Sequence, residues 1–194
     1  MGVYVMNTKH DSRENILAAA RRLFHIQGYH ATGLNQILKE SGAPKGSLYY
    51  YFPNGKEQLA IEAVNTMAQF IITDIQNHLK ESENACEALQ YHLRCIANRF
   101  DDIDNIECIP IGLLAAETSS ISEPLRMACK TAFESWEALY RQKLIESGME
   151  PDQAHQISFV INALIEGAIT RSLTTKDGQP LRYAADCIPL LLQR

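Results

Sequence analysis

Apolar residues recur every three or four positions through almost the whole chain, and this spacing constrains the fold more than any other feature. The first such run has five apolar residues on one helical face, namely Ile16, Leu17, Ala20, Leu23 and Phe24. Gly28 then ends the run. No segment alternates apolar and polar residues in the way that a half-buried strand does. The sequence therefore predicts an all-α protein.

Capping residues and breakers divide residues 11–55 into three helices of decreasing length. Asp11 or Ser12 is the expected N-cap of the first helix, and Thr32 caps a short second helix that ends at Gly42. Pro44 suits the first turn of a third helix, because its missing N–H costs nothing there. The sequence Pro-Asn-Gly at 53–55 breaks that helix. Three short helices with a glycine-containing turn describe a helix-turn-helix unit.

The rest of the chain predicts six more helices, about nine in all. They are expected near residues 56–79, 85–103, 108–120, 123–147, 152–174 and 180–192. We expect a helix-turn-helix domain over residues 1–56 and a second helical domain over residues 57–194.

Charge is distributed unevenly between these two parts. Residues 1–60 carry seven Lys and Arg against four Asp and Glu, and the remaining residues carry eleven against nineteen, so balances of +3 and −8 make up the net −5. A basic head on an acidic body is typical of a DNA-binding protein with a separate regulatory domain. The sequence contains neither an apolar stretch of about 20 residues nor a signal-peptide pattern. We therefore expect a cytoplasmic protein without a membrane partner.

The cysteine pattern predicts neither a metal site nor a cofactor. Five cysteines are scattered through the helical segments, at positions Cys86, Cys95, Cys108, Cys129 and Cys187. No pair has the spacing of a zinc site, and the histidines do not cluster near them. They are interpreted as buried free thiols, with a redox-sensing role as the alternative.

The helix expected at 152–174 is apolar around most of its circumference, so it must be covered on more than one side. A second subunit is the expected cover, and a helix simply central in the monomer is the alternative. The homodimer interface is predicted to contain small and aliphatic residues of this helix and of the last one, namely Ile161, Ala163, Leu164, Gly167, Ala168, Ala184 and Ile188.

Residues 16–59 carry a longer pattern of fixed spacings. It comprises Ile-Leu-Ala-Ala-Ala at 16–20, Leu-Phe at 23–24, Gly-Tyr at 28–29, Ala-Thr at 31–32, Ile37, Ser-Gly at 41–42 and Lys-Gly-Ser-Leu-Tyr-Tyr-Tyr-Phe at 45–52. This pattern strongly resembles the TetR family of one-component repressors. Residues 109–117 are similar to the LmrA/YxaF-like branch of that family. Two positions depart from the family pattern: Pro44 stands where Ser or Asn is common, and Gly55 is inserted before Lys56.

The third helix is expected to read operator DNA with its first turns. Lys45 suits a phosphate or a guanine edge, Gly46 admits close backbone approach, and Ser47 offers a hydroxyl. Tyr49 and Tyr50 offer hydroxyls to phosphates and ring faces to a thymine methyl group.

Other residues of this segment are expected to clamp phosphates or to fill the core. Thr32 and Lys56, each at a helix N-terminus, are predicted phosphate contacts. Leu48 and Phe52 are expected to face inward, while Tyr51 suits either the core or DNA.

The resemblance implies that residues 57–194 form an effector-binding and dimerisation domain, in which a small-molecule effector binds among apolar residues of the later helices. Its predicted wall consists of Met67, Phe70, Ile71, Phe100, Ile103, Leu113, Trp136, Tyr140, Phe159 and Asn162. Glu117 and Glu166 stand in apolar surroundings, and a buried acid must be paired, protonated or useful. They are expected either to anchor the effector or to bond a helix end or the partner subunit.

These features together predict a homodimeric DNA-binding regulator, most simply a repressor that a small hydrophobic effector releases from its operator. An enzyme is the first rival, but beyond a speculative pairing of Glu117 with Glu166 the sequence offers no catalytic constellation. A protein-interaction module with a vestigial helix-turn-helix is the second rival. Sequence does not distinguish a repressor from an activator.

Overall fold

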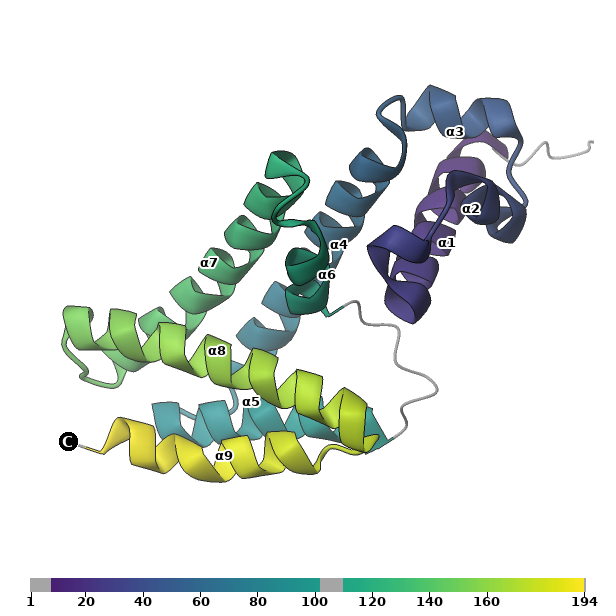
Figure 1. Ribbon diagram of the computed structural model, residues 1–194. Helices are drawn as coiled ribbons and strands as arrows, with labels where there is room; N and C mark the ends of the chain where they lie inside the picture. Colours follow the sequence, from purple (N-terminus) through teal and green to yellow (C-terminus); the bar gives the residue numbers. More distant parts are fainter. Residues whose placement is uncertain (1–7, 102–109, 194) are drawn as a thin grey trace, which may run out of the picture. The chain divides into compact units, whose positions relative to one another are not determined.

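The computed structural model describes residues 8–101 and 110–193. Over these residues it contains nine α-helices and no strand, which confirms the predicted all-α class. The helices are α1 (Thr8–Ala31), α2 (Leu34–Ser41), α3 (Lys45–Tyr51), α4 (Gly55–Leu79), α5 (Ala85–Arg99), α6 (Ile111–Thr118), α7 (Glu123–Glu146), α8 (Pro151–Thr175) and α9 (Gln179–Leu192) (Figure 1).

The chain divides into two compact units. The first unit comprises Met1–Met67 with Glu107–Cys129, and the second comprises Ala68–Ile106 with Lys130–Arg194. Helices α1, α2, α3 and α6 thus belong to the first unit and α5, α8 and α9 to the second, while α4 and α7 contribute to both. These units are defined by packing and do not test the domain boundary expected between residues 56 and 57, which stays a prediction.

In the first unit, α1 packs against α2, α3 and α6 around an apolar core. Five residues with at most 3% exposure form its centre, namely Ile16, Phe24, Ile37, Leu48 and Phe52. The expected starts of two helices were wrong. The N-cap of α2 is Gly33 rather than Thr32, and Pro44 is itself the N-cap of α3 rather than a residue of its first turn. Gly42 ends α2 in the left-handed conformation, as a C-terminal glycine commonly does.

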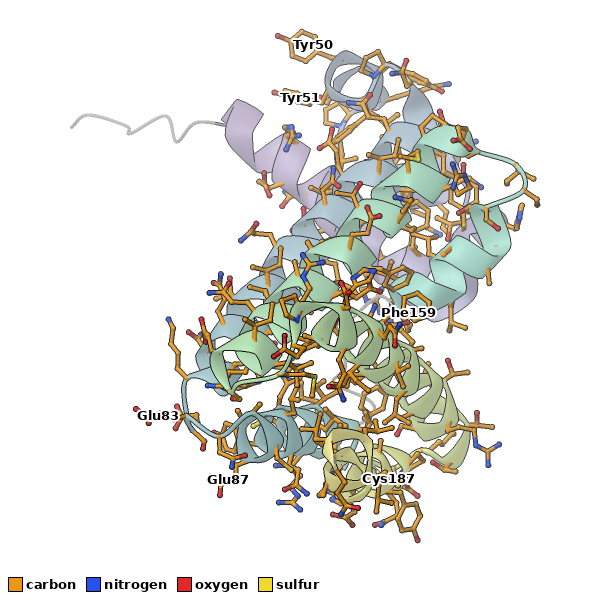
Figure 2. All side chains as sticks on the ribbon, turned by 90° about the vertical axis from the view of Figure 1, so that its left-hand side faces the viewer. Tyr50, Tyr51, Glu83, Glu87, Phe159 and Cys187 are labelled. Atoms are coloured by element: carbon orange, nitrogen blue, oxygen red, sulfur yellow. The ribbon has the colours of Figure 1, made fainter. Side chains whose placement is uncertain are left out.

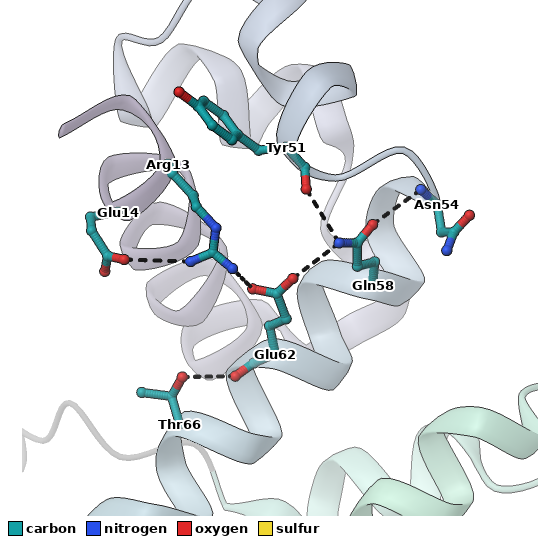
Figure 3. Close-up of polar contacts among 7 residues, drawn as sticks. All are labelled: Arg13, Glu14, Tyr51, Asn54, Gln58, Glu62 and Thr66. Carbon is teal, nitrogen blue, oxygen red and sulfur yellow. Dashed lines mark hydrogen bonds and ion pairs between the residues drawn. The ribbon is translucent and has the colours of Figure 1, made fainter. Parts of the chain in front are cut away.

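A polar network fixes the start of α4 against α1 and α3 (Figure 3). The Gln58 amide donates to the backbone oxygen of Tyr51 at 3.3 Å and to the Glu62 carboxylate at 3.0 Å. Its oxygen accepts from the backbone N–H of Asn54 at 3.2 Å. Glu62 also pairs with Arg13 of α1. Because this network connects α3 with α1 and α4, it holds the short helix α3 in place.

In the second unit, α9 packs against both α5 and α8. The Asn84 side chain caps α5 by accepting from the N–H groups of Cys86 and Glu87. Helices α5 and α9 come very close where α9 begins. A Cβ atom on Gly178 would overlap the carbonyl oxygen of Ala97 and lie 2.7 Å from its carbon. Only a residue without a side chain fits this contact.

The cysteine prediction is met only in part. Cys129 is buried, but Cys187 is exposed on α9, and Cys86 and Cys95 are partly exposed. Cys108 and the expected wall residue Ile103 lie outside the described residues. Within residues 8–101 and 110–193, no cluster of three potential metal ligands occurs. No helix among the described residues is both long and apolar enough to cross a bilayer.

Candidate nucleic-acid interface and regulatory core

Helix α3 has one buried face and one exposed face. Leu48 on α3 and the adjoining Phe52 are fully buried, as predicted, and anchor the helix. Lys45 and Gly46 are exposed at its first turn, and Ser47 is half-buried. Apart from its chain neighbours and its own helix backbone, no atom of the described residues would lie within 4 Å of a Cβ at position 46, so Gly46 faces open space. The predicted base-reading residues thus share an accessible turn, although their contact with DNA stays a prediction.

The tyrosines of α3 differ in exposure. Tyr49 is 49% exposed and Tyr50 is 75% exposed, and Tyr50 projects outward from the helix (Figure 2). Tyr51 is half-buried, and its ring packs edge-on against Tyr50. An exposed aromatic ring leaves apolar area in contact with water. Two such rings on one short helix therefore favour a surface that a partner covers.

The predicted phosphate contact of Thr32 was wrong. Its side chain is 1% exposed, and its hydroxyl donates to the backbone oxygen of Gly28 at 2.8 Å. A buried hydroxyl with a satisfied donor cannot reach a DNA phosphate. Thr32 instead closes the turn between α1 and α2.

Lys56 is directed at the same turn rather than at solvent. Its Nζ donates to the backbone oxygens of Tyr29 at 2.9 Å and of Thr32 at 3.0 Å, and lies 4.2 Å from the centre of the Tyr29 ring. Burial lowers the pKa of Lys56, while the nearby Glu117 carboxylate opposes this shift. The expected phosphate clamp is therefore corrected to a structural cation that binds the carbonyl end of the α1–α2 turn.

Glu117 of α6 binds the opposite end of this turn. Its Oε2 accepts from the backbone N–H groups of Tyr29 at 2.8 Å and of His30 at 3.1 Å. This arrangement contradicts the effector-anchor reading of Glu117 and matches the alternative that it bonds a helix end. Both partners lie within the first unit.

The residues predicted for the effector wall differ in their exposure and in the unit to which they belong. In the second unit, Phe100, Trp136, Tyr140 and Asn162 are buried, with at most 6% exposure. Phe159 is 61% exposed, Phe70 is 51% exposed and Leu113 is 42% exposed, so an inward wall position is wrong for these three. Met67 is buried in the first unit, and Glu166 of α8 is partly exposed. Ile71 is also partly exposed.

Beside the buried residues runs a chain of polar side chains that the sequence did not predict. His78 Nδ1 lies 2.9 Å from His92 Nδ1, and His92 Nε2 lies 3.0 Å from the Tyr140 hydroxyl. Burial, with Glu166 nearby, raises the pKa of Tyr140, and burial lowers the pKa of His78. The chain joins α4, α5 and α7 inside the second unit. A polar chain of this kind in an apolar interior holds the helices in one register.

We expect the buried histidine to make the protein less stable in mild acid. Burial, with His78 and Arg99 as lesser causes, lowers the pKa of His92 to about 3. An unfolded histidine titrates near pH 6.5, so below that pH the unfolded chain binds a proton that the folded chain does not. Each pH unit below about 6.5 should then remove roughly 1.4 kcal/mol of the free energy of unfolding, until the folded pKa is reached.

Equilibrium unfolding at pH 7.5 and 5.5, at one protein concentration, measures this effect. The wild-type chain should lose about 1 kcal/mol more between the two pH values than His92→Gln, which cannot titrate there. His155→Gln is the matched control, because it removes a histidine from an exposed position. An unchanged pH dependence in His92→Gln would show that other groups cause the acid sensitivity.

The dimerisation residues predicted from sequence also need correction. Ile161, Ala168, Ala184 and Ile188 are buried within the single chain, with at most 7% exposure. They pack the core of the second unit because α8 and α9 turn these positions toward each other and toward α5. Of the predicted set, Ala163 and Gly167 are exposed and Leu164 is partly exposed.

The exposed sides of α8 and α9 carry a different apolar set, which we call the α8/α9 face. It consists of Phe159, Val160, Ala163 and Gly167 on α8 with Tyr183, Cys187 and Leu190 on α9. Figure 2 shows Phe159 and Cys187 at the surface of the second unit. The sequence signal for this face was the apolar circumference of α8.

A solvent-open groove of about 510 Å³ lies elsewhere in the second unit. Its lining includes Glu83, Asn84, Leu144, Met149 and Leu192. None of the residues predicted for the effector wall lines it. The groove therefore lends no support to that wall.

The helix-turn-helix with its exposed recognition helix defines a DNA-binding protein. Two family models match the chain: "Bacterial regulatory proteins, tetR family" over residues 16–63, and "Transcriptional regulator LmrA/YxaF-like, C-terminal domain" over residues 85–187. The chain belongs to the TetR family of DNA-binding transcriptional regulators, and its C-terminal part is of the LmrA/YxaF-like type.

Individual relatives match over nearly their full length. The regulator YxaF of Bacillus subtilis is 52% identical over 189 residues, which cover 97% of this chain and 99% of YxaF. The regulator LmrA of the same organism is 53% identical over 184 residues, covering 95% and 98%. The crystal structure of reduced NemR from Escherichia coli superimposes with a TM-score of 0.80 at 26% identity, covering 94% and 98%. These relatives are transcriptional regulators rather than enzymes.

Proposed function

We propose that this regulator is a homodimeric repressor, which leaves its operator when a small hydrophobic effector binds the C-terminal part. The exposed turn of α3, with Lys45, Tyr49 and Tyr50 held outward by buried Leu48, is the observation that carries the DNA-binding role. The proposal keeps residues 1–56 as the DNA-binding domain and residues 57–194 as the effector-binding and dimerisation domain. NemR of Escherichia coli, 28% identical over 189 residues, is named a repressor, which supports the sign of regulation.

Dimerisation through the α8/α9 face is part of this proposal. Side chains such as Phe159 and Leu190, 61% and 66% exposed, leave apolar area open to water in the single chain. Ala163 and Gly167 are small and one helical turn apart, so a partner helix could approach closely there. Two copies of α8 and α9 would form a symmetric four-helix interface. Such a dimer would present two recognition helices to successive major grooves about 34–36 Å apart.

The effector is proposed to bind among the buried residues of the second unit. Phe100, Trp136, Tyr140 and Asn162 supply apolar surface with a few polar groups, as ligand sites commonly do. The Asn162 amide now donates to Glu137 at 3.1 Å, so a hydrogen-bonding effector would have to compete with that contact. An uncharged, largely apolar molecule is the chemical class that suits such surroundings.

The double variant Lys45→Ala, Tyr49→Ala tests the DNA-binding role. We expect affinity for DNA from the upstream region of its own gene to fall about tenfold to a hundredfold, because each recognition helix loses a cation and a ring. The slope of log affinity against log salt should fall by about 2 in magnitude, since a dimer loses two phosphate-binding cations.

Lys80→Ala is the matched control for charge, because Lys80 is exposed in the second unit. It should bind DNA as the wild type does. If the folded wild-type dimer binds no DNA selectively at low salt, the proposal fails and a protein-interaction module becomes the better explanation. Selective binding that raises transcription of a reporter gene would instead identify an activator.

A further inference from the structure

The chain turns from α1 into α2 over residues 28–33, and this turn begins within the last residues of α1, at a backbone conformation that only glycine adopts readily. Gly28 has φ 78° and ψ 176° and interrupts the helical path of α1. The next N–H groups, of Tyr29 and His30, start a new helical turn and therefore lack the partners that an unbroken helix would supply. Glu117 Oε2 accepts from both, at 2.8 Å and 3.1 Å.

The fit between Gly28 and Glu117 is close. A Cβ atom on Gly28 would overlap Glu117 Oε1 and lie 3.1 Å from the carboxylate carbon. His30 adds a second contact, because its Nε2 lies 3.1 Å from the backbone oxygen of Glu117. Glycine at position 28 thus serves both the backbone conformation and the approach of the carboxylate.

The opposite end of the turn is held by a positive charge. Lys56 of α4 donates to the backbone oxygens of Tyr29 and Thr32, and Thr32 itself donates to that of Gly28. A negative charge at the N–H end and a positive charge at the carbonyl end both suit the dipole of a helical turn. We call Glu117, Lys56 and the turn between them the α6 clasp.

We propose that Glu117 is a positioning residue, which fixes the helix-turn-helix on α6 so that withdrawing its carboxylate lowers DNA affinity without unfolding the chain. This inference rests on the proposed function. Withdrawal leaves two N–H groups without a partner and removes the anion beside Lys56, so the junction that leads into α2 and α3 loses its fixed geometry. Any change that shifts α6 would reach the recognition helix by this route.

Amide hydrogen exchange on the free protein tests the clasp directly. In Glu117→Ala, the amides of Tyr29 and His30 should exchange about tenfold faster or more, while that of Leu23 in the same helix stays unchanged. Glu117→Gln keeps an oxygen acceptor without the charge and should fall between Ala and the wild type. Glu123→Gln is the control, because Glu123 is exposed in the same unit and pairs with Arg126.

DNA affinity and a double-mutant cycle test the positioning role. Glu117→Ala should weaken selective DNA binding about tenfold while leaving the helix content and dimer of the protein intact. Gly28→Ala should cost less affinity in the Glu117→Ala background than in the wild type, because there the new methyl group meets no carboxylate.

Three outcomes would overturn the inference: unchanged exchange at Tyr29 and His30, equal cost of Gly28→Ala in both backgrounds, or affinity lost only in step with global unfolding. If the wild-type chain binds no DNA selectively, the proposed function fails, and the link from the clasp to DNA fails with it. Hydrogen exchange would still decide whether the clasp exists, so the two failures are distinguishable.

Discussion

If the proposed dimer forms through the α8/α9 face, replacing Ala163 by arginine should convert it into a monomer and reduce operator affinity by about a hundredfold or more. Ala163 lies at the centre of the α8/α9 face, with Phe159 and Gly167 one turn away on either side. Two symmetry-related arginines would place like charges and long side chains where small residues allow close helix contact. A monomer binds with one recognition helix, so it loses the gain that comes from linking two heads.

Sedimentation measures the mass, and DNA titration of the same samples measures the affinity. Gln142→Arg is the matched control, because Gln142 is exposed on α7 and the substitution adds the same charge. It should remain a dimer and bind as the wild type does. A folded Ala163→Arg dimer with wild-type affinity would refute the α8/α9 face as the interface.

Replacing Gly178 by alanine should destabilise the second unit by about 2–4 kcal/mol. The added methyl group would overlap the backbone oxygen of Ala97, and a backbone group cannot rotate away as a side chain can. Helix α9 would have to shift at its start, where the Gly178 N–H donates to Asp101 at 3.2 Å. Asp101 also pairs with Arg182, so the shift would weaken that pair too.

Chemical unfolding at a fixed protein concentration measures the loss. Gly33→Ala is the control, because a Cβ there has no neighbour within 4 Å and the backbone conformation is an ordinary one. It should change stability by about 1 kcal/mol or less. If Gly178→Ala and Gly33→Ala lower the free energy of unfolding by the same amount, the contact between Gly178 and Ala97 does not limit the packing of α5 against α9.

Local features of the sequence were enough to predict that the chain is helical and that it begins with a helix-turn-helix unit. Apolar spacing, with breakers such as Gly42 and Pro53, was enough to identify α1, α2 and α3 and the inward direction of Leu48 and Phe52. The core requires Leu48, one of the seven residues of α3, and the adjoining Phe52, so Lys45 and Tyr49 were expected to face outward. Contact of this outward surface with DNA stays a prediction. The residues at which helices begin were harder to predict, because a cap can depend on a single side-chain hydrogen bond. Thr32 was the predicted N-cap of α2, but its hydroxyl donates to the backbone oxygen of Gly28 instead.

Only the tertiary structure decided which partner each polar side chain takes. Lys56 of α4 and Glu117 of α6 converge on the turn that contains Thr32. The sequence left a helix end as only one of several partners for Glu117 and did not predict backbone oxygens as the partners of Thr32 and Lys56. The same holds for His78 and His92, which lie 14 positions apart and meet across two helices. A polar residue has several acceptable partners, and its choice depends on distances set by distant segments.

The sequence by itself determined the helical class and the three N-terminal helices, and it showed that α8 is apolar around most of its circumference. That a second subunit covers α8 stays a prediction. It could not determine which side of α8 faces the monomer core, because apolar residues surround that helix and every orientation buries some of them. Packing against α9 resolved this by turning Ile161 and Ala168 inward and leaving Ala163 and Gly167 exposed. A helical period fixes which residues share a face, whereas burial of that face depends on the segments that pack against it.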